Sequence, residues 1–349
     1  MTLTQSATTV PAETSDTSSD ILASASTLVD EIATTWDMND ELDAMCRYAV
    51  TPAGKLFRPY LLLEACSAVG GDLHGAVPAA IGAEYGHVAS LVHDDIIDGD
   101  LTRRGRPAVH AAYGRDHAIV VGDSLIFRLF LALPECADRG VSADRVVASL
   151  RAVASAGVEL CRGQTLETRL CGDPAVSLDD YRRMVRGKTA ALFRGSCEVG
   201  ALLGGGDDRQ VAALGSFGEQ LGIAFQMVDD LLAYQSNSGA AGKDLLSDVR
   251  NRRMTFPLIV ACQVEPEQSR RTLHRVFTTI ESSGSSPATE QWASGVIVDL
   301  LKRTSALAEA SKIIDVHAAT ALEALEVLPR TGPRDRLGGL VTSAVERAA

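Results

Sequence analysis

Apolar residues recur along most of the chain at intervals of three and four positions. The pattern starts near Ile21, is clear at Val29 and Ile32, and returns in later segments such as Leu300–Leu307. This spacing places apolar side chains on one face of a helix. The alternation of apolar and polar residues that is typical of a strand never extends beyond a few positions. The pattern therefore predicts an all-α protein.

Clusters of glycine, proline and aspartate interrupt the helical pattern and predict loops near residues 69–78, 171–180, 203–210 and 282–290. No short repeat of the solenoid type is present. We expect a single helical domain over residues 19–349. Residues 1–18 are rich in threonine and serine and poor in apolar residues, so they are expected to be disordered. They also lack the apolar segment of a signal peptide.

The composition limits the kind of ligand that the protein binds. The chain has 349 residues, of which 46% are hydrophobic and only 5% aromatic, and its formal net charge is −12. The acidic balance argues against a nucleic-acid partner. It would also repel a polyanionic substrate, which would need local cations or bound metal ions.

The cysteines and the most apolar segment bear on the compartment. Seven cysteines have neither disulfide-framework nor zinc-site spacing, so free, mostly buried thiols in the cytoplasm are expected. The most apolar run, His117–Leu133, is interrupted by Asp123 and Arg128 and is too short to span a bilayer. We therefore expect no membrane insertion.

The stretch LVHDDIIDGDLTRRG (91–105) places carboxylates inside an apolar, helix-period run. Asp94 and Asp98 are four residues apart, so both leave the same face of a helix, and Asp95 lies about 100° round. Taken alone, the stretch is equally well interpreted as a solvated helix end in which Arg103 and Arg104 pair with the aspartates.

A second acidic pair, Asp229 and Asp230 in FQMVDDLL (225–232), shifts this balance. Two such pairs on two helices could face each other across a cavity, and oxygen-only ligands suit Mg²⁺, whose coordination is commonly completed by substrate phosphates. Basic segments lie in the same part of the sequence: GKLFRP (54–59), RRG (103–105), RGKTAALF (186–193) and GKDLLSDVRNRRMTFP (242–257). Together these segments have the parts of a multi-metal diphosphate clamp.

In order and spacing these motifs resemble the trans-type isoprenyl diphosphate synthases (polyprenyl synthetases), in particular bacterial geranylgeranyl diphosphate synthases. The resemblance runs from Ala53 to Pro257 through AGKLFRP, DDIID, RRGRP, LCRGQ, KTAALF, FQMVDD and the closing GK…D…T-x-P series. It implies an all-helical bundle around a central hydrophobic cavity, and a homodimer.

The resemblance implies Mg²⁺-dependent, head-to-tail condensation of isopentenyl diphosphate with an allylic diphosphate, with release of pyrophosphate. Three Mg²⁺ ions would act once a diphosphate is bound. By position, the implied roles are metal binding for Asp94, Asp98 and Asp229, with Asp95 and Asp230 sharing it; allylic diphosphate binding for Arg103, Lys188 and Arg253; isopentenyl diphosphate binding for Lys55, Arg58, His87 and Arg104; and lining of the reaction centre for Thr189 and Gln226.

The resemblance also implies a hydrophobic tunnel beside the helix that carries the first motif, and residues four and five before its first aspartate would form the floor. These are Ser90 and Ala89, both small, so the chain should grow beyond C15. Tyr85, one turn deeper, would stop it. The expected main product is geranylgeranyl diphosphate (C20).

Three positions depart from the family pattern. Ala233 stands at the fifth position of a second motif that often reads DDxxD, Arg253 takes the place of a common lysine, and Leu56 takes the place of an arginine. The first change removes one potential metal ligand. The last removes a cation from the isopentenyl diphosphate side.

Two other interpretations stay open. A class I terpene cyclase, or another prenyl coupling on the same fold, would ionise a diphosphate in the same way. Its second metal motif would fall on Lys243, Ser247 and Asn251, which have the right spacing but the wrong ligand types. A regulatory subunit of a heteromeric prenyl synthase would tolerate Leu56 and Ala233, although the intact first motif argues against it.

Overall fold

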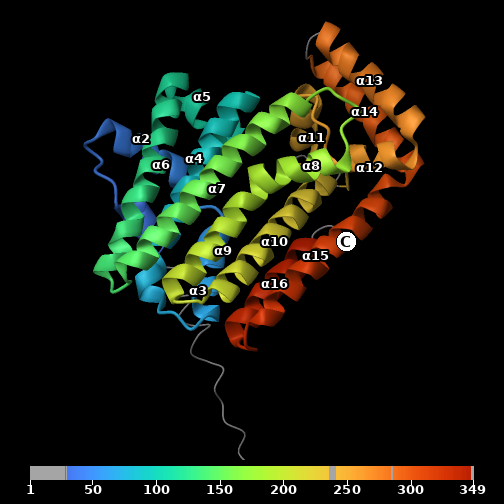
Figure 1. The fold of residues 1–349 in the computed structure, drawn as a ribbon. Coiled ribbons are helices and arrows are strands. Elements are labelled where there is room, and N and C mark those ends of the chain that lie inside the picture. Colours follow the sequence, from blue (N-terminus) through green and yellow to red (C-terminus); the bar gives the residue numbers. More distant parts are fainter. Residues whose placement is uncertain (1–27, 29, 236–240, 284–285, 347–349) are drawn as a thin grey trace, which may run out of the picture.

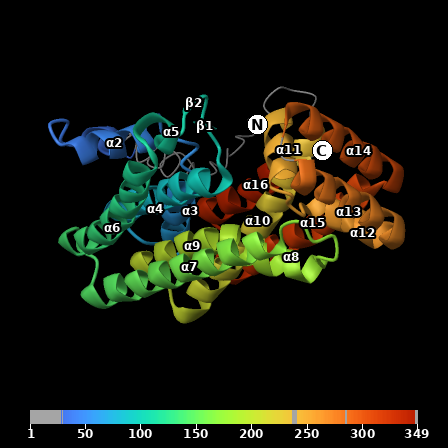
Figure 2. The same cartoon turned by 90° about the horizontal axis from the view of Figure 1, so that it is seen from above.

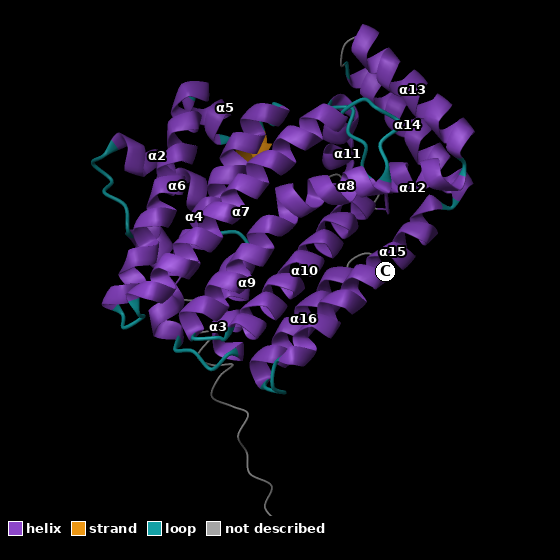
Figure 3. Cartoon of the chain, viewed as in Figure 1, coloured by secondary structure: helices purple, strands orange, loops and turns teal. Residues whose placement is uncertain are grey.

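The computed structural model describes residues 28, 30–235, 241–283 and 286–346. The segment 1–18, predicted to be disordered, lies outside these residues. Within them the chain is helical apart from one short two-stranded hairpin, drawn in orange in Figure 3. The prediction of an all-α protein is confirmed.

The first half of the fold contains long antiparallel helices and the hairpin (Figure 1). Its elements are α2 (Glu41–Val50), α3 (Phe57–Ala68), α4 (Leu73–Asp98), β1 (Thr102–Arg103), β2 (Arg106–Pro107), α5 (Val109–Tyr113), α6 (Arg115–Asp138), α7 (Ala143–Leu170) and α8 (Leu178–Val185).

The second half begins with a π-helix and continues with α-helices. Its elements are the π-helix η1 (Arg186–Ala190), α9 (Ala191–Gly204), α10 (Asp208–Gln235), α11 (Ala241–Arg250), α12 (Phe256–Val264), α13 (Pro266–Ser283), α14 (Pro287–Thr304), α15 (Ala306–Ala324), the 3₁₀ turn η2 (Leu325–Val327) and α16 (Gly332–Glu346).

Helix α4 packs against α6 and α3, and α9 contacts α3, α7 and α10 (Figures 1 and 2). Helix α10 also packs along α15. The last helix, α16, returns to α3, and apolar residues of the two helices belong to one buried cluster. The C-terminal helix thus packs against a helix from the first quarter of the chain.

The ends of α4 fix the position of the first aspartate motif. The Asp72 side chain caps the N-terminus by accepting a hydrogen bond from a backbone N–H of the first turn at 3.0 Å. Gly99 ends the helix in the left-handed region, with φ of 69°, which glycine adopts without steric cost. Asp94 and Asp98 therefore lie in the last turns of α4, directly before the β1–β2 hairpin.

A buried ion pair connects α3 with α16. Glu64 on α3 is fully buried and accepts a hydrogen bond from Arg336 Nε at 2.7 Å. A buried carboxylate without its cation is costly. The pair therefore holds the last helix in one position on α3.

The chemistry expected from the composition also agrees with the structure. All seven cysteines are free thiols, and most are buried, as predicted. Among the described residues, no helix combines the length and the apolar character needed to cross a bilayer.

Candidate active site

A polar cavity of about 660 Å³ lies between the last turns of α4 and the second half of α10. Asp94 and Asp98 line it from α4, and Asp229 and Asp230 line it from α10. The prediction that the two acidic segments face one cavity is therefore confirmed. The other charged residues in its wall are Asp100, Arg103, Glu167, Lys188, Asp248 and Arg253.

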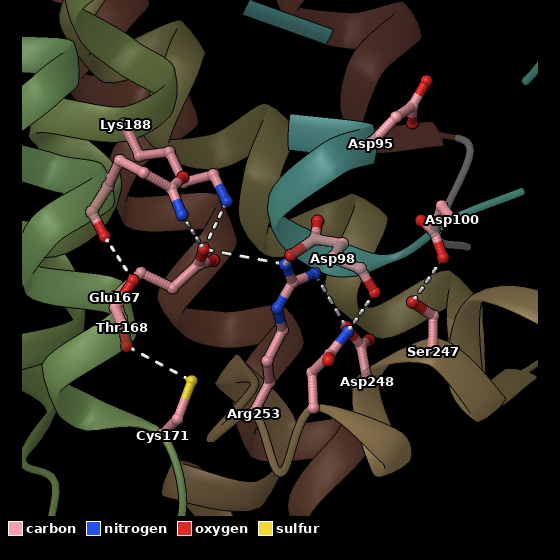
Figure 4. A network of polar contacts seen from close by, with 12 residues as sticks. Asp95, Asp98, Asp100, Glu167, Thr168, Cys171, Lys188, Ser247, Asp248 and Arg253 are labelled. Atoms are coloured by element: carbon pink, nitrogen blue, oxygen red, sulfur yellow. Dashed lines mark hydrogen bonds and ion pairs between the residues drawn. The ribbon is translucent and has the colours of Figure 1, made fainter. Parts of the chain in front are cut away.

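Asp95 points away from this cavity, as Figure 4 shows. It is 2% exposed, accepts a hydrogen bond from Arg103 Nε at 2.9 Å and forms an ion pair with the same guanidinium group. The reason is helical geometry, since the residue after Asp94 leaves the helix about 100° round. Asp95 thus lies outside the polar cavity that it was expected to share with Asp94 and Asp98. Arg103, expected to contact a diphosphate rather than an aspartate, is the partner of Asp95, although it also lines the cavity.

Asp230 is held by three donors. Its carboxylate accepts from Tyr181 Oη at 2.9 Å, from the Phe256 backbone N–H at 2.9 Å and from Gln226 Nε2 at 2.8 Å. The amide oxygen of Gln226 in turn accepts from Thr189 Oγ1 at 2.8 Å. A carboxylate engaged in this way has little capacity left for a metal ion. Asp230 thus fixes Gln226 at the cavity wall, and Gln226 connects it to Thr189.

Arg253 and Lys188 form ion pairs with carboxylates from three helices, α4, α7 and α11 (Figure 4). Arg253 forms ion pairs with Asp98, with Asp248 at 3.4 Å and with Glu167 at 3.7 Å. Lys188 pairs with the same Glu167. Burial acts to lower the pKa of Arg253, but the three carboxylates raise it overall. The Arg253 guanidinium group thus connects α4, α7 and α11, which are far apart in the sequence.

Burial also acts on the carboxylates themselves. It raises the pKa of Asp94 to about 6; Lys188 opposes this rise, and Asp98 adds to it. It raises the pKa of Asp248 to about 7, against the effect of Arg253. Burial raises a carboxyl pKa because it disfavours the charged form, and nearby positive charge restores that form. The cavity therefore favours additional positive charge.

The π-helix η1 carries Lys188 into the cavity wall, and Thr189 beside it donates a hydrogen bond to Gln226 of the same wall. Single-turn π segments inside α-helices are frequent at functional sites. A Cβ atom at Gly163 on α7 would overlap the backbone nitrogen of Lys188, and one at Gly187 would lie 2.7 Å from the Glu159 carbonyl oxygen. The two glycines allow α7 and η1 to approach closely enough for Lys188 to reach Glu167, one turn after Gly163.

A second polar cluster lies where α3, α4 and the β1–β2 turn meet. It brings together Arg58, His87 and Arg104, three of the four residues predicted to bind isopentenyl diphosphate. Arg58 Nε and His87 Nδ1 are buried and lack hydrogen-bond partners. Burial lowers the pKa of His87, and both arginines lower it further. Lys55, the fourth residue, is exposed.

Four acidic residues in the polar cavity and in this second cluster were not predicted to have a role. Their only signal was a carboxylate inside an apolar helical run or beside a quoted motif, as in AAIGAEYGHVA (79–89) and GQTLE (163–167). They are Glu84, Asp100, Glu167 and Asp248.

An apolar cavity of about 790 Å³ lies between α4, α6, α7 and α9. Its wall on α4 is formed by Ala79, Ala83, Gly86, Ser90 and His93, which recur at three- and four-residue intervals and so share one face. From Ser90 to Ala79 this face carries only small side chains over about 16 Å of helix. The cavity suits an extended apolar chain.

Two of the predicted chain-length residues lie elsewhere. Ser90 lines the cavity, whereas Ala89 is buried in an apolar cluster and Tyr85 packs edge-on against Trp36, with ring centroids 5.6 Å apart. Tyr85 precedes Ser90 by five positions and therefore leaves α4 on another face. Neither Ala89 nor Tyr85 lines this cavity, so its walls give no support to their expected roles in setting the chain length.

The donor set fits magnesium only together with a ligand. Asp94, Asp98 and Asp229 offer carboxylate oxygens, which Mg²⁺ prefers. In the part of the chain that the structure describes, no group of three or more histidine, cysteine or acidic side chains is arranged to hold an ion alone. Mg²⁺ bound by these carboxylates would complete its coordination with water or phosphate oxygens.

Carboxylates and cations gathered at the end of a helix, with a long apolar cavity on a neighbouring face of the same helix, define a class of protein. Its members bind a metal-associated diphosphate and keep the attached apolar chain away from water. The all-helical scaffold is that of the isoprenoid synthases.

Comparisons with known proteins give the family. Residues 39–288 match the family model described as polyprenyl synthetase. The chain is 33% identical over 300 residues to the short chain isoprenyl diphosphate synthase of Methanothermobacter thermautotrophicus, covering 86% of this chain and 88% of that protein. The crystal structure of geranylgeranyl pyrophosphate synthetase from Pyrococcus horikoshii matches with a TM-score of 0.81 and 30% identity, over 95% of this chain and 99% of that one. The chain belongs to the polyprenyl synthetase family.

A further relative is the geranylgeranyl diphosphate synthase of Mycobacterium tuberculosis, which is 40% identical over 219 residues. This alignment covers 63% of the chain and 61% of the relative, less than two thirds of its length. The farnesyl diphosphate synthase of the same species is 42% identical over 205 residues, covering 59% of the chain and 56% of the relative.

The contact between α7 and the π-helix gives a testable prediction. Gly163→Ala should push Lys188 away from Glu167 and lower kcat, because a displacement of 1 Å at a reacting centre can cost about 100-fold in rate. Gly295→Ala on α14 is the control, since a Cβ atom there meets nothing within 4 Å. Steady-state kinetics together with thermal unfolding would measure both variants. Unchanged kcat in Gly163→Ala would contradict the role given to this close contact.

Proposed function

We propose that the protein is a prenyltransferase that condenses isopentenyl diphosphate with an allylic diphosphate and releases pyrophosphate, giving an all-trans prenyl diphosphate. The observation that carries the proposal is the use of two faces of α4. One face presents Asp94 and Asp98 to a polar cavity, and the other lines an apolar cavity. The relatives described above are named as synthases of such products.

The polar cavity is proposed to hold the allylic diphosphate. Asp94, Asp98 and Asp229 would bind Mg²⁺ there, which supplies neutralisation of the charge that develops on the leaving pyrophosphate. Lys188 and Arg253 already lie in the wall and would exchange their carboxylate partners for phosphate oxygens. Preorganised cations of this kind stabilise a leaving group because they need no reorganisation during the reaction.

The second cluster is proposed to hold isopentenyl diphosphate. Arg58, His87 and Arg104 converge there, and Lys55 is exposed beside Gly54, which packs against Arg104. The unpartnered atoms Arg58 Nε and His87 Nδ1 support a polar ligand, because buried polar groups are rarely left without partners.

The apolar cavity is proposed to protect the reaction from water. Ionisation of the allylic diphosphate leaves a carbocation, which the double bond of isopentenyl diphosphate attacks. A proton is then lost, and the released pyrophosphate is the proposed acceptor. Gln226 lies in the wall of the polar cavity and accepts a hydrogen bond from Thr189, so both residues would lie near the reacting groups in fixed orientations.

The proposal is tested by incubating the protein with isopentenyl diphosphate, Mg²⁺ and dimethylallyl, geranyl or farnesyl diphosphate, with chain-length analysis of the products. We expect elongated products that disappear when EDTA removes the metal. Asp98→Asn should lower kcat by about 10²–10³-fold, as expected for loss of one electrostatic contact to the leaving group. If no primer is elongated, the terpene cyclase and the regulatory subunit become the better interpretations; activity restored by a partner chain would identify the latter.

The proposed main product is geranylgeranyl diphosphate. Small residues of α4, from Ser90 to Ala79, line the apolar cavity, and relatives from several organisms are named geranylgeranyl diphosphate synthase. Ser90→Phe should shorten the product to C15, because the ring would block the cavity near the reaction centre. Tyr85→Phe is the control and should leave the product unchanged, since Tyr85 lies outside the cavity. The measurement is product chromatography; an unchanged product in Ser90→Phe would contradict the assignment.

We also propose a cytoplasmic homodimer. The free thiols are typical of a reducing compartment. Phe127 and Leu131 on α6 share a face and are 69% and 68% exposed, as expected of an interface. The double variant Phe127→Glu, Leu131→Glu should be monomeric by light scattering, whereas Val316→Glu at an exposed position on α15 should remain dimeric. A monomeric wild-type protein would overturn this proposal.

A further inference from the structure

Glu84 is a buried carboxylate inside the cationic cluster proposed to hold isopentenyl diphosphate. It lies on α4, one turn before His87, and is 1% exposed. Neither of its carboxylate oxygens has a hydrogen-bond partner. Buried polar groups without partners are costly and few in native proteins. Its place in the core therefore needs a physical reason.

Two arginines act on the charge of this carboxylate. Arg104 Nη2 lies 3.9 Å from Glu84 Oε1, and Arg58 is the other cation whose charge acts on Glu84. Burial raises the pKa of Glu84, and both arginines oppose that rise. The 3.9 Å separation is longer than a hydrogen bond. The arginines thus neutralise the carboxylate while their N–H groups stay available to a ligand.

The backbone holds Arg104 in this position. Its φ of 51° lies in the left-handed region, and Arg104 Nη1 donates a hydrogen bond to the Pro52 carbonyl oxygen at 3.1 Å. On the other side, the Arg58 guanidinium stacks over the Phe193 ring, 4.9 Å from its centroid. Both arginines are therefore held by contacts of their own, and Glu84 is the acidic group on which both charges act.

By charge alone, a carboxylate is unfavourable beside a diphosphate, because like charges repel. Two arginines that approach one small volume also repel each other before the ligand binds, and a carboxylate between them offsets this repulsion. The geometry therefore favours a role in orientation over a role in direct binding.

We propose that Glu84 is a positioning residue for isopentenyl diphosphate: its carboxylate holds Arg58 and Arg104 at the separation at which both guanidinium groups contact one diphosphate. This inference rests on the proposed function, because it concerns the same candidate site.

The test is Glu84→Gln. Two possible roles of Glu84 predict opposite changes in the affinity for isopentenyl diphosphate. If Glu84 only adds negative charge, its removal should tighten binding of the diphosphate. If it positions the arginines, KM for isopentenyl diphosphate should rise about tenfold, whereas kcat and KM for the allylic diphosphate stay within twofold. Glu84→Asp keeps the charge and should show a smaller rise in the same KM. It also carries the test if Glu84→Gln does not fold.

Glu64→Gln is the matched control, since Glu64 is also a fully buried carboxylate paired with an arginine, outside both cavities. It should lower the unfolding temperature and leave both KM values unchanged. A KM for isopentenyl diphosphate that falls or stays constant in Glu84→Gln, or stays constant in Glu84→Asp when the former is unfolded, would overturn the inference.

Calorimetric titration of the wild-type protein with isopentenyl diphosphate separates this inference from the proposed function. If the wild type does not bind this ligand, the proposed site itself is wrong. If the wild type binds and Glu84→Gln binds equally well or more tightly, only the role of Glu84 is wrong.

Discussion

Repulsion between carboxylates confined to one cavity is the constraint on which the arrangement of this protein depends. Seven acidic side chains line the polar cavity, and three cations, Arg103, Lys188 and Arg253, share its wall. Arg253 connects the end of α4 to α7 and α11, and Lys188 connects η1 to α7. The cations thus hold together helices that would otherwise be driven apart by their own charges, and the remaining negative charge makes the cavity receptive to metal ions and their ligands.

Those cations are placed by backbone features that no single motif encodes. Lys188 reaches the cavity because η1 shifts the register of the helix by a π turn, and the absence of side chains at Gly163 and Gly187 lets α7 come close to that turn. Asp230, although part of an acidic pair, accepts hydrogen bonds from three groups and keeps α10 and the start of α12 in register. Support of this kind is what keeps the catalytic groups rigid.

Sequence reasoning predicted what depends on local periodicity. The three- and four-residue spacing gave the helices, and the spacing of Asp94 and Asp98 placed both on one face, as the structure confirms. It failed where the position of a residue depends on the face from which its side chain leaves the helix, or on contacts between distant segments. Asp95 turns toward Arg103 because its position on the helix differs by about 100° from that of Asp94. Tyr85 was placed by its depth along the helix, without regard to the face from which it leaves. The roles of Glu167 and Asp248 depend on contacts between distant helices, because both residues form ion pairs with Arg253.

The two working faces of α4 have a consequence for the evolution of such proteins. Residues that set the depth of the apolar cavity leave the helix on a different side from the aspartates of the polar cavity. One turn of α4 along the face lined by small residues corresponds to about 5.4 Å of cavity depth. Under the proposed function, selection would alter the size of the product in discrete steps, by exchanging one small side chain for a larger one, while the residues proposed to perform the chemistry remain unchanged. One helix would thus carry both the residues that keep the reaction constant and, on another face, the residues whose exchange varies the product.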